Sequence, residues 1–273
     1  MIVRYALMNR NAESVEQDAF VRAFRGVPGL TPVDAKVVGN PESGILVRKL
    51  SLEQAIALQT NLKAAGRETE VVPEMALPVP PEGRIIRSLE FSADNLQVRD
   101  VLQRSTIVAK QDVRLLAAGS VRTAAFARRR IETHEVRAHT LHIPIHALPL
   151  MIPIVQHETR VHYVQRESEE WVLRAEIMVI NQRFVIEGEK FDYDCLGSAM
   201  TQDLATNFCL LVQELAAKFS PPLVCRGVRS ILADPPDFAY YPNKDAFQNE
   251  LIWLLWHEAL KLAGNEKESC SNP

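Results

Sequence analysis

The first 72 residues constrain the fold of this chain most, because strand-like segments and capped helical segments alternate in them in a fixed order. Residues 2–8 are strand-like, with apolar side chains recurring on one face. The segments 14–17 and 51–54 each form a capping box, in which a serine and a glutamine three residues later satisfy backbone amides at a helix start. The remaining strand-like segments are 33–38, 45–48 and 68–72. The order is therefore strand, helix, strand, strand, helix, strand.

This order is that of the ferredoxin-like βαββαβ fold, in which two helices cover one face of a four-stranded sheet, and we predict such a domain for residues 1–72. Metal-carrying relatives of this fold resemble one another in a CxxC motif after the first strand, and RNA-binding relatives carry stacking aromatics on the central strands. Here the first loop, residues 8–11, reads Met-Asn-Arg-Asn, and the central strands offer mainly Val, Ile and Leu. An acylphosphatase-like site would need a Gly-rich loop around Arg10, which the sequence lacks. We therefore interpret the domain as a structural or regulatory module.

A proline-rich segment follows this domain. Residues 73–83 contain four prolines, which fix the backbone and remove amide donors, so neither a helix nor a central strand continues through them. We predict a semi-rigid extended linker here. A second, strand-rich α+β domain is predicted for residues 84–264, and a disordered polar tail for residues 265–273.

Three strands of a meander are predicted in the second domain, at 160–166, 171–179 and 183–191. The segment 167–170 has the length of a hairpin connection. Apolar residues at steps of three or four predict a helix near 198–219, and a last helix near 244–263 is apolar in almost every direction. In its order of elements, the segment 84–219 is similar to bacterial PH-like domains, and the resemblance implies a barrel or strongly bent sheet that ends in one helix.

Histidines are concentrated in one stretch of the second domain, where six of the seven lie between positions 134 and 162. Imidazole is a common metal ligand, so a site for zinc or another divalent metal is one hypothesis, with Glu135 or Glu158 contributing a carboxylate. Its candidate ligands are His139, His142, His146, His157 and His162. We favour structural or solvent-facing histidines, because His142 and His146 would lie about 13 Å apart on an extended chain at about 3.3 Å per residue, too far to share one zinc ion.

The same stretch contains an apolar segment, residues 142–155, that proline interrupts every four or five residues. Neither a regular helix nor a central strand tolerates that spacing. The segment is either an insertion packed on the domain or an exposed surface for a partner, and the sharper hypothesis is self-association through it. The candidate interface residues are Leu148, Leu150, Met151 and Ile152, together with Trp253 and Trp256 of the last helix. For that helix we favour burial within the monomer.

A group of arginines offers another type of binding site. Arg128, Arg129 and Arg130 are consecutive, and Arg122 lies a few residues before them. Guanidinium forks match phosphate geometry, so these residues could bind a phosphate or a lipid head group. We favour a solvated face or a protected strand edge.

No motif in the sequence assembles a catalytic set: a Walker loop, a Rossmann glycine pattern, a nucleophile elbow and HExxH are all absent from it. None of the four cysteines forms a CxxC pair, and a net charge of −3 gives no footprint for sequence-specific nucleic-acid binding. The longest apolar run, residues 147–155, is too short to span a bilayer, and the start of the chain does not resemble a signal peptide. We therefore expect a cytoplasmic protein without a transmembrane segment, and peripheral membrane contact stays open.

These observations predict a non-enzymatic binding or regulatory protein without a cofactor, which acts through contacts with a protein partner or with itself. One alternative is a metal-dependent enzyme that uses the histidine-rich region 134–162. A weaker alternative is a binder of a phosphorylated or anionic ligand at Arg128–Arg130.

Overall fold

The computed structural model describes residues 3–10, 16–31, 33–35, 44–143 and 150–269, with the side chains of 125–168 and 262–269 left aside. The chain forms two compact units. Residues 1–122 and 171–273 make up the first unit, here called the body. Residues 123–170 make up the second, here called the ribbon.

The N-terminal part of the body is a three-stranded antiparallel sheet with two helices. Its elements are β1 (Tyr5–Asn9), α1 (Gln17–Ala23), β2 (Ile45–Leu50), α3 (Leu52–Ala64) and β3 (Thr69–Pro73). β1 is central and pairs antiparallel with both β2 and β3. The capping box predicted at 51–54 is confirmed, because Gln54 N donates to Ser51 Oγ and Ser51 N donates to Gln54 Oε1. The box predicted at 14–17 lies partly outside the described residues, and α1 has no side-chain cap at Glu16.

The segment predicted as a strand at 33–38 begins as a helix instead. Residues 33–35 are helical, and 36–38 lie outside the described residues. Thr31 and Asp34 explain the difference: Thr31 N donates to the Asp34 carboxylate at 2.6 Å, and Asp34 N donates to Thr31 Oγ1 at 3.3 Å. This reciprocal pair is a capping box with Asp in the place of Glu, and it starts a helical turn. The same hydrogen bonds from Thr31 lower the pKa of Asp34.

Both faces of the N-terminal sheet are covered. Leu7 of β1 belongs to an apolar cluster with Phe20 of α1 and Leu58 of α3. The neighbouring positions Ala6 and Met8 fall on the other face of the strand and belong to the core of the rest of the body. The N-terminal sheet is therefore continuous in its packing with the rest of the body, beyond the linker predicted from sequence.

The last helix, α6 (Lys244–Ser269), provides much of this packing. Trp253 Nε1 donates a buried hydrogen bond to Asn9 O at 2.7 Å. Gly44 precedes β2 with φ of +95°, and a Cβ there would lie 3.3 Å from Cβ of Trp253. Trp253 and Trp256 are only 6% and 7% exposed, so the burial expected for this helix is provided by the chain itself.

The two segments predicted to lack regular structure differ from each other. In the linker, β3 ends at Pro73, a single 3-10 turn follows at Glu74–Ala76, and the next strand begins at Gly83. In the predicted tail, residues 265–269 are helical because α6 continues to Ser269, and 270–273 lie outside the described residues.

The larger sheet has eight strands. They are β4 (Gly83–Phe91), β5 (Asn95–Asp100), β6 (Ser105–Ala109), β7 (Val113–Ile143), β8 (Leu150–Val179), β9 (Gln182–Glu187), β10 (Leu223–Val224) and β11 (Tyr240–Tyr241). Their order is β10-β7-β8-β9-β4-β5-β6, and β11 also pairs with β7. The sheet is mixed, because β4–β9, β7–β10 and β7–β11 are parallel pairs. Among the described residues the sheet is open, so the closed barrel among our expectations is not found there.

Three helices pack on this sheet. They are α4 (Leu204–Phe219), α5 (Arg226–Ile231) and α6, and short 3-10 turns lie at Lys110–Asp112, Gly188–Lys190 and Asp194–Ala199. The helix predicted near 198–219 is confirmed, with its start at Leu204 because the Asp203 carboxylate accepts from Thr206 N at 2.7 Å. Phe208, Leu211 and Leu215 of α4 lie in the main core.

β7 is covered on both faces within the body. Leu115, Leu116, Ala117 and Ala118 are all buried, and successive residues of a strand point to opposite faces. α5 approaches so closely that a Cβ on Gly227 would lie 1.8 Å from the carbonyl oxygen of Ala118. This packing fixes the start of β7 firmly.

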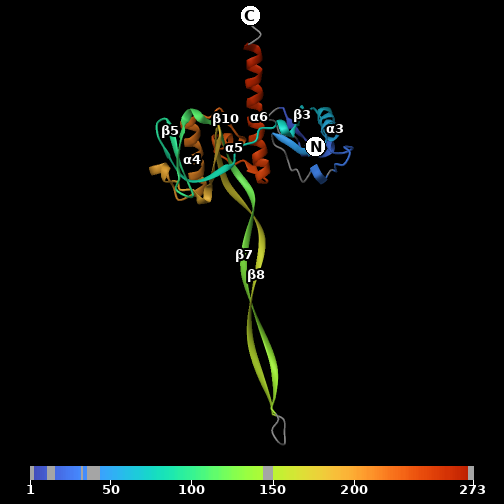
Figure 1. Cartoon of the computed structure of the whole chain (residues 1–273), viewed down its shortest axis with the longest axis vertical. Helices are drawn as coiled ribbons and strands as arrows, with labels where there is room; N and C mark the ends of the chain where they lie inside the picture. The colour runs from blue at the N-terminus through green and yellow to red at the C-terminus, as the bar shows by residue number, and fades with distance from the viewer. Residues whose placement is uncertain (1–2, 11–15, 32, 36–43, 144–149, 270–273) are drawn as a thin grey trace. The chain divides into compact units, whose positions relative to one another are not determined.

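β7 and β8 are by far the longest strands. β8 runs without interruption through residues 167–170, so the turn predicted there is wrong. The next hairpin is confirmed, because Val179 of β8 pairs with Gln182 of β9. In the ribbon β7 and β8 wind about each other as a two-stranded structure, drawn in green and yellow in Figure 1.

Candidate functional site

The ribbon is the part of the structure whose backbone pairing is least complete. In the body, the outer edge of β7 pairs with β10 at Leu115 and Leu116 and with β11 at Ser120 and Val121. The outer edge of β8 pairs with β9 over Arg174–Val179. Over residues 123–143 and 150–170, β7 and β8 pair with no further strand among the described residues. Each strand of the ribbon therefore presents one long backbone edge.

Such edges have physical consequences. A strand of 21 residues, such as 123–143, extends for about 70 Å at about 3.3 Å per residue. An isolated two-stranded hairpin is marginally stable in water, and a row of unpaired N–H and C=O groups is a template for another strand. Proline protects an edge because it lacks the N–H, and β8 contains Pro153, whereas all 31 residues of β7 are free of proline.

Charge is distributed unevenly along the ribbon. Residues 123–170 contain six arginines, six glutamates, no lysine and no aspartate. Within them, residues 138–157 contain no Asp, Glu, Lys or Arg at all, and their ionisable side chains are four histidines. The segment joining the two strands is therefore apolar and uncharged above the usual pKa of histidine, about 6.5.

The histidines of the predicted metal site lie in or next to the ribbon, where the structure describes the backbone alone, so the site stays a prediction. The backbone of His139 and His142 lies on β7 and that of His157 and His162 on β8, while His146 lies outside the described residues. Among the described residues, no group of three or more His, Cys, Asp and Glu side chains could hold a metal ion.

The arginine group is divided between the units. Arg122 is an exposed residue of the body, and Arg128, Arg129 and Arg130 are consecutive positions of β7 in the ribbon. The side chains of these three residues are outside the description, so the phosphate site stays a prediction.

The predicted apolar interface is divided in the same way. Leu150, Met151 and Ile152 lie at the start of β8, whereas Leu148 is outside the described residues. The two tryptophans belong to the core of the body.

Two exposed aromatic residues lie in the body where β8 enters it. Trp171 is 49% exposed and Tyr240 is 56% exposed, and their rings meet edge to face with centroids 5.4 Å apart. Aromatic pairs of this kind are enriched in protein interfaces. The sequence prediction missed this pair, which β11 brings to the edge of β7 through the pairing of Tyr240 with Ser120.

A buried polar cluster in the body holds β11, α5 and α6 together. Glu250 is 2% exposed and accepts hydrogen bonds from Arg226 N at 2.7 Å, Arg226 Nε at 3.2 Å and Tyr241 Oη at 2.8 Å. Burial raises the pKa of the Cys225 thiol to about 11 and raises the pKa of Tyr241 far above its usual range. A protonated thiol and phenol are poor nucleophiles and bases near neutral pH, so the arrangement is suited to holding elements together.

A second buried group connects β8 with β9. Arg174 and Arg183 contact the fully buried Glu176 carboxylate at 2.7 and 3.5 Å. Arg183 Nε is buried without a hydrogen-bond partner among the described residues, and a Cβ on Gly83 of β4 would lie 3.2 Å from it. The group fixes three neighbouring strands of the sheet close to the end of the ribbon in sequence.

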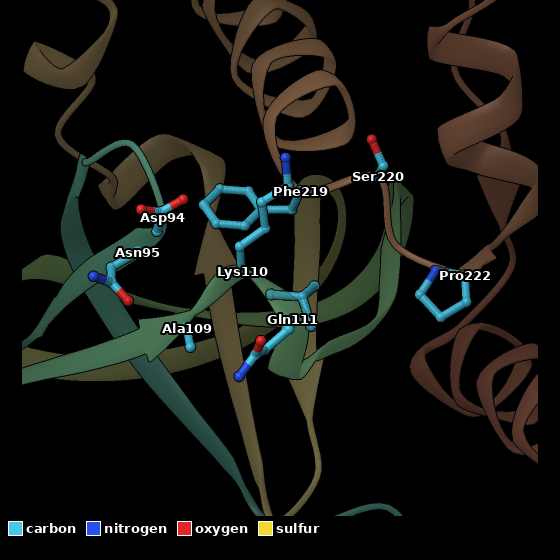
Figure 2. A pocket seen from close by; sticks show the side chains of 9 residues that line it. Asp94, Asn95, Ala109, Lys110, Gln111, Phe219, Ser220 and Pro222 are labelled. Carbon is cyan, nitrogen blue, oxygen red and sulfur yellow. The ribbon is translucent and has the colours of Figure 1, made fainter.

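The body also has an open pocket with a volume of about 570 Å³ (Figure 2). Its lining residues are Asp94, Asn95, Ala109, Lys110, Gln111, Val113, Phe219, Ser220 and Pro222. The volume is in the range of small-molecule sites. However, Asp94, Lys110 and Gln111 are exposed at its rim, so the pocket offers no desolvated polar group from these residues to orient a ligand.

The ribbon itself had a signal in the sequence. Residues 123–170 contain no Gly, Asn or Asp, which are the residues that most often make turns. A long stretch without these residues favours uninterrupted strands, as in β7 and β8.

Comparison of the chain with protein-family models, with curated proteins and with solved structures found no match. None of the helices in the described part of the chain combines the length and the apolar character needed to cross a membrane.

Proposed function

We propose that this chain is a non-enzymatic binding protein that engages a protein partner through the ribbon. The observation that carries the proposal is the pair of long strands that, over 123–143 and 150–170, pair with no third strand among the described residues. A two-stranded ribbon has neither a buried face of its own nor paired outer edges, so a partner would stabilise it.

The sequence of the ribbon supports a protein as the partner. A surface without charge over residues 138–157 favours contact with another apolar surface. The backbone edges of the strands require hydrogen-bonding partners, which a protein strand supplies. A partner strand added to the ribbon would satisfy both requirements together.

The body has well-packed strands of its own. Within the body, α5 packs on β7, the Glu250 cluster holds β11, which pairs with β7, and the Glu176 group ties β8 to β9. We propose a ferredoxin-like origin for the N-terminal unit, supported by the order β2-β1-β3 and its two helices. We also propose a distant relation of residues 84–219 to PH-like domains, supported by strands followed by α4, and a cytoplasmic location.

The test is a variant with a shortened ribbon. Residues 131–162 are replaced by Asn-Gly, a two-residue hairpin turn, which keeps the eight positions 123–130 and the eight positions 163–170. Full-length and shortened chains carry the same tag and are expressed in the native source together with an untagged full-length copy. As a control, Ile107→Thr changes a 70% exposed residue of β6 at another edge of the sheet.

The proposal expects the shortened variant to lose the proteins, or the second copy, that co-purify with the full-length chain and with Ile107→Thr. The melting temperature of the body should stay within a few degrees, because its cores lie outside the replaced residues. Equal co-purification with the full-length and shortened chains would contradict a binding role of the ribbon.

A further inference from the structure

We infer that the partner of the ribbon is a second copy of this chain, paired with the first through the outer edges of the two β7 strands. The strands run antiparallel about a two-fold axis at Ile131. This inference rests on the proposed function and names its partner.

Of the two outer edges of the ribbon, that of β7 is better suited than that of β8 to pair with another strand. In the body it already accepts the added strands β10 and β11, at Leu115–Leu116 and Ser120–Val121. From residue 123 onward no described strand pairs with this edge, and β7 contains no proline that would interrupt its backbone hydrogen bonding. The edge of β8 contains Pro153, which cannot donate to a ladder.

Charge complementarity favours one register over its immediate neighbours. A two-fold axis perpendicular to the sheet places residues of equal parity opposite each other. With Ile131 on the axis, Arg130 of each copy lies opposite Glu132 of the other, so the pair occurs twice. Opposite charges at directly opposed positions stabilise a sheet, and like charges destabilise it.

The neighbouring positions agree with this register. Arg128 becomes diagonal to Glu132, and Arg129 becomes diagonal to Glu135, within reach of a long side chain. Moving the axis by one residue in either direction would place Arg130 opposite Arg130 or Glu132 opposite Glu132. The axis at Ile131 avoids both of these repulsive pairs.

A second copy also fits the backbone better than a lipid bilayer does. The uncharged segment 138–157 is compatible with lipid. The open edges of a two-stranded ribbon are not, because hydrocarbon offers no partner to backbone N–H and C=O groups. Strand pairing between copies satisfies the edges of β7, and the dimer is closed because each copy contributes the same edge.

Charge reversal tests the register by sedimentation velocity of the full chain over a range of concentrations. Arg130→Glu and Glu132→Arg alone each create two like-charged pairs and should weaken the dimer by about tenfold or more. The double variant restores opposite charges and should bring the dissociation constant back to within about threefold of the original.

Oxidative cross-linking tests the axis itself. Ile131→Cys places two thiols directly opposite each other at a separation that a disulfide spans, whereas Thr133→Cys places them four residues apart, beyond the limit of about 7 Å between Cα atoms. The unsubstituted chain, whose cysteines include Cys195, Cys209 and Cys225, is oxidised in parallel as the control. Only Ile131→Cys should give a covalent dimer.

Three outcomes overturn the inference. They are a monomer at every concentration, a dimer indifferent to both charge reversals, and continued growth beyond the dimer, which would indicate pairing of β7 with β8 of the next copy. Flotation of a strictly monomeric chain with phosphatidylcholine vesicles would assign the ribbon to lipid instead. If the chain is monomeric but the shortened variant still loses co-purifying proteins, the inference fails and the proposed function stands.

Discussion

The Glu250 cluster gives the sharpest test of how the body is held together. Glu250→Ala removes a carboxylate that accepts three hydrogen bonds and forms an ion pair with Arg226, whose side chain is 21% exposed. Removing one partner of a buried ion pair costs about 3–5 kcal/mol in the free energy of unfolding. For a domain of this size class, about 2–4 °C of melting temperature corresponds to each kcal/mol, so a fall of about 6–20 °C is expected.

Two milder substitutions separate the contributions to this loss of unfolding free energy. Glu250→Gln keeps the shape but loses the charge, and should cost about 1.5–3 kcal/mol because hydrogen bonds to charged groups are worth that much. Tyr241→Phe removes one donor to the same carboxylate, at 2.8 Å, and should likewise cost about 1.5–3 kcal/mol.

The assay is thermal unfolding at pH 7 followed by far-UV circular dichroism. Glu214→Gln is the matched control, because its pair with Lys218 is 3.5 Å long and about half exposed, and such pairs contribute about 0–1 kcal/mol. The reasoning is refuted if Glu250→Ala melts within about 2 °C of the original chain, which corresponds to 1 kcal/mol or less.

Three further predictions concern the packing of the body. Burial lowers the pKa of His257, so folding favours its neutral form. The contribution of this residue to the free energy of unfolding should be fully present above about pH 6.5 and be lost as the pH falls below that value. His257→Phe should therefore make the melting temperature less dependent on pH between about pH 5 and 7. Gly227→Ala should cost more than about 3 kcal/mol, since its Cβ would lie 1.8 Å from the carbonyl oxygen of Ala118, whereas Gly66→Ala, with open space and φ of +76°, should cost about 1–2 kcal/mol in urea unfolding. Ser51→Ala should cost about 1 kcal/mol by the same measurement, because it removes the capping box of α3, and an unchanged midpoint would contradict that role.

The parts of the fold that could be predicted from the sequence are those that local chemistry determines. The capping residues Ser51 and Gln54 predict α3, and the apolar stripe predicts α4. The alternation of apolar and polar residues on either side of 180–181 predicts the β8–β9 hairpin. The helical turn at residues 33–35 also has a local cause, the hydrogen-bonded pair Thr31 and Asp34. The sequence did not reveal it, because the alternation of apolar and polar residues after Thr31 is typical of a strand.

The parts that could not be predicted depend on contacts between distant residues. The segment 167–170 has the polar composition of a turn, and it is extended because β7, some 45 residues earlier in the chain, supplies its partner strand: Thr123 Oγ1 donates to Glu170 O. The histidines and arginines drew attention as clusters in sequence. Their backbone lies on extended strands, so residues that are near one another in sequence are spread along the ribbon at about 3.3 Å per residue.

Hydrogen exchange of the backbone amides of β7 tests the central claim most directly, because it measures whether the edge of the ribbon is paired. The full-length chain is exchanged at concentrations well below and well above the association midpoint, with peptides that cover residues 123–139. The account predicts that their exchange slows at high concentration, while exchange of the deeply buried residues 115–118 in the body stays unchanged. Equal exchange of residues 123–139 at every concentration, and in the presence of any protein that co-purifies with the chain, would contradict a ribbon that binds through this edge.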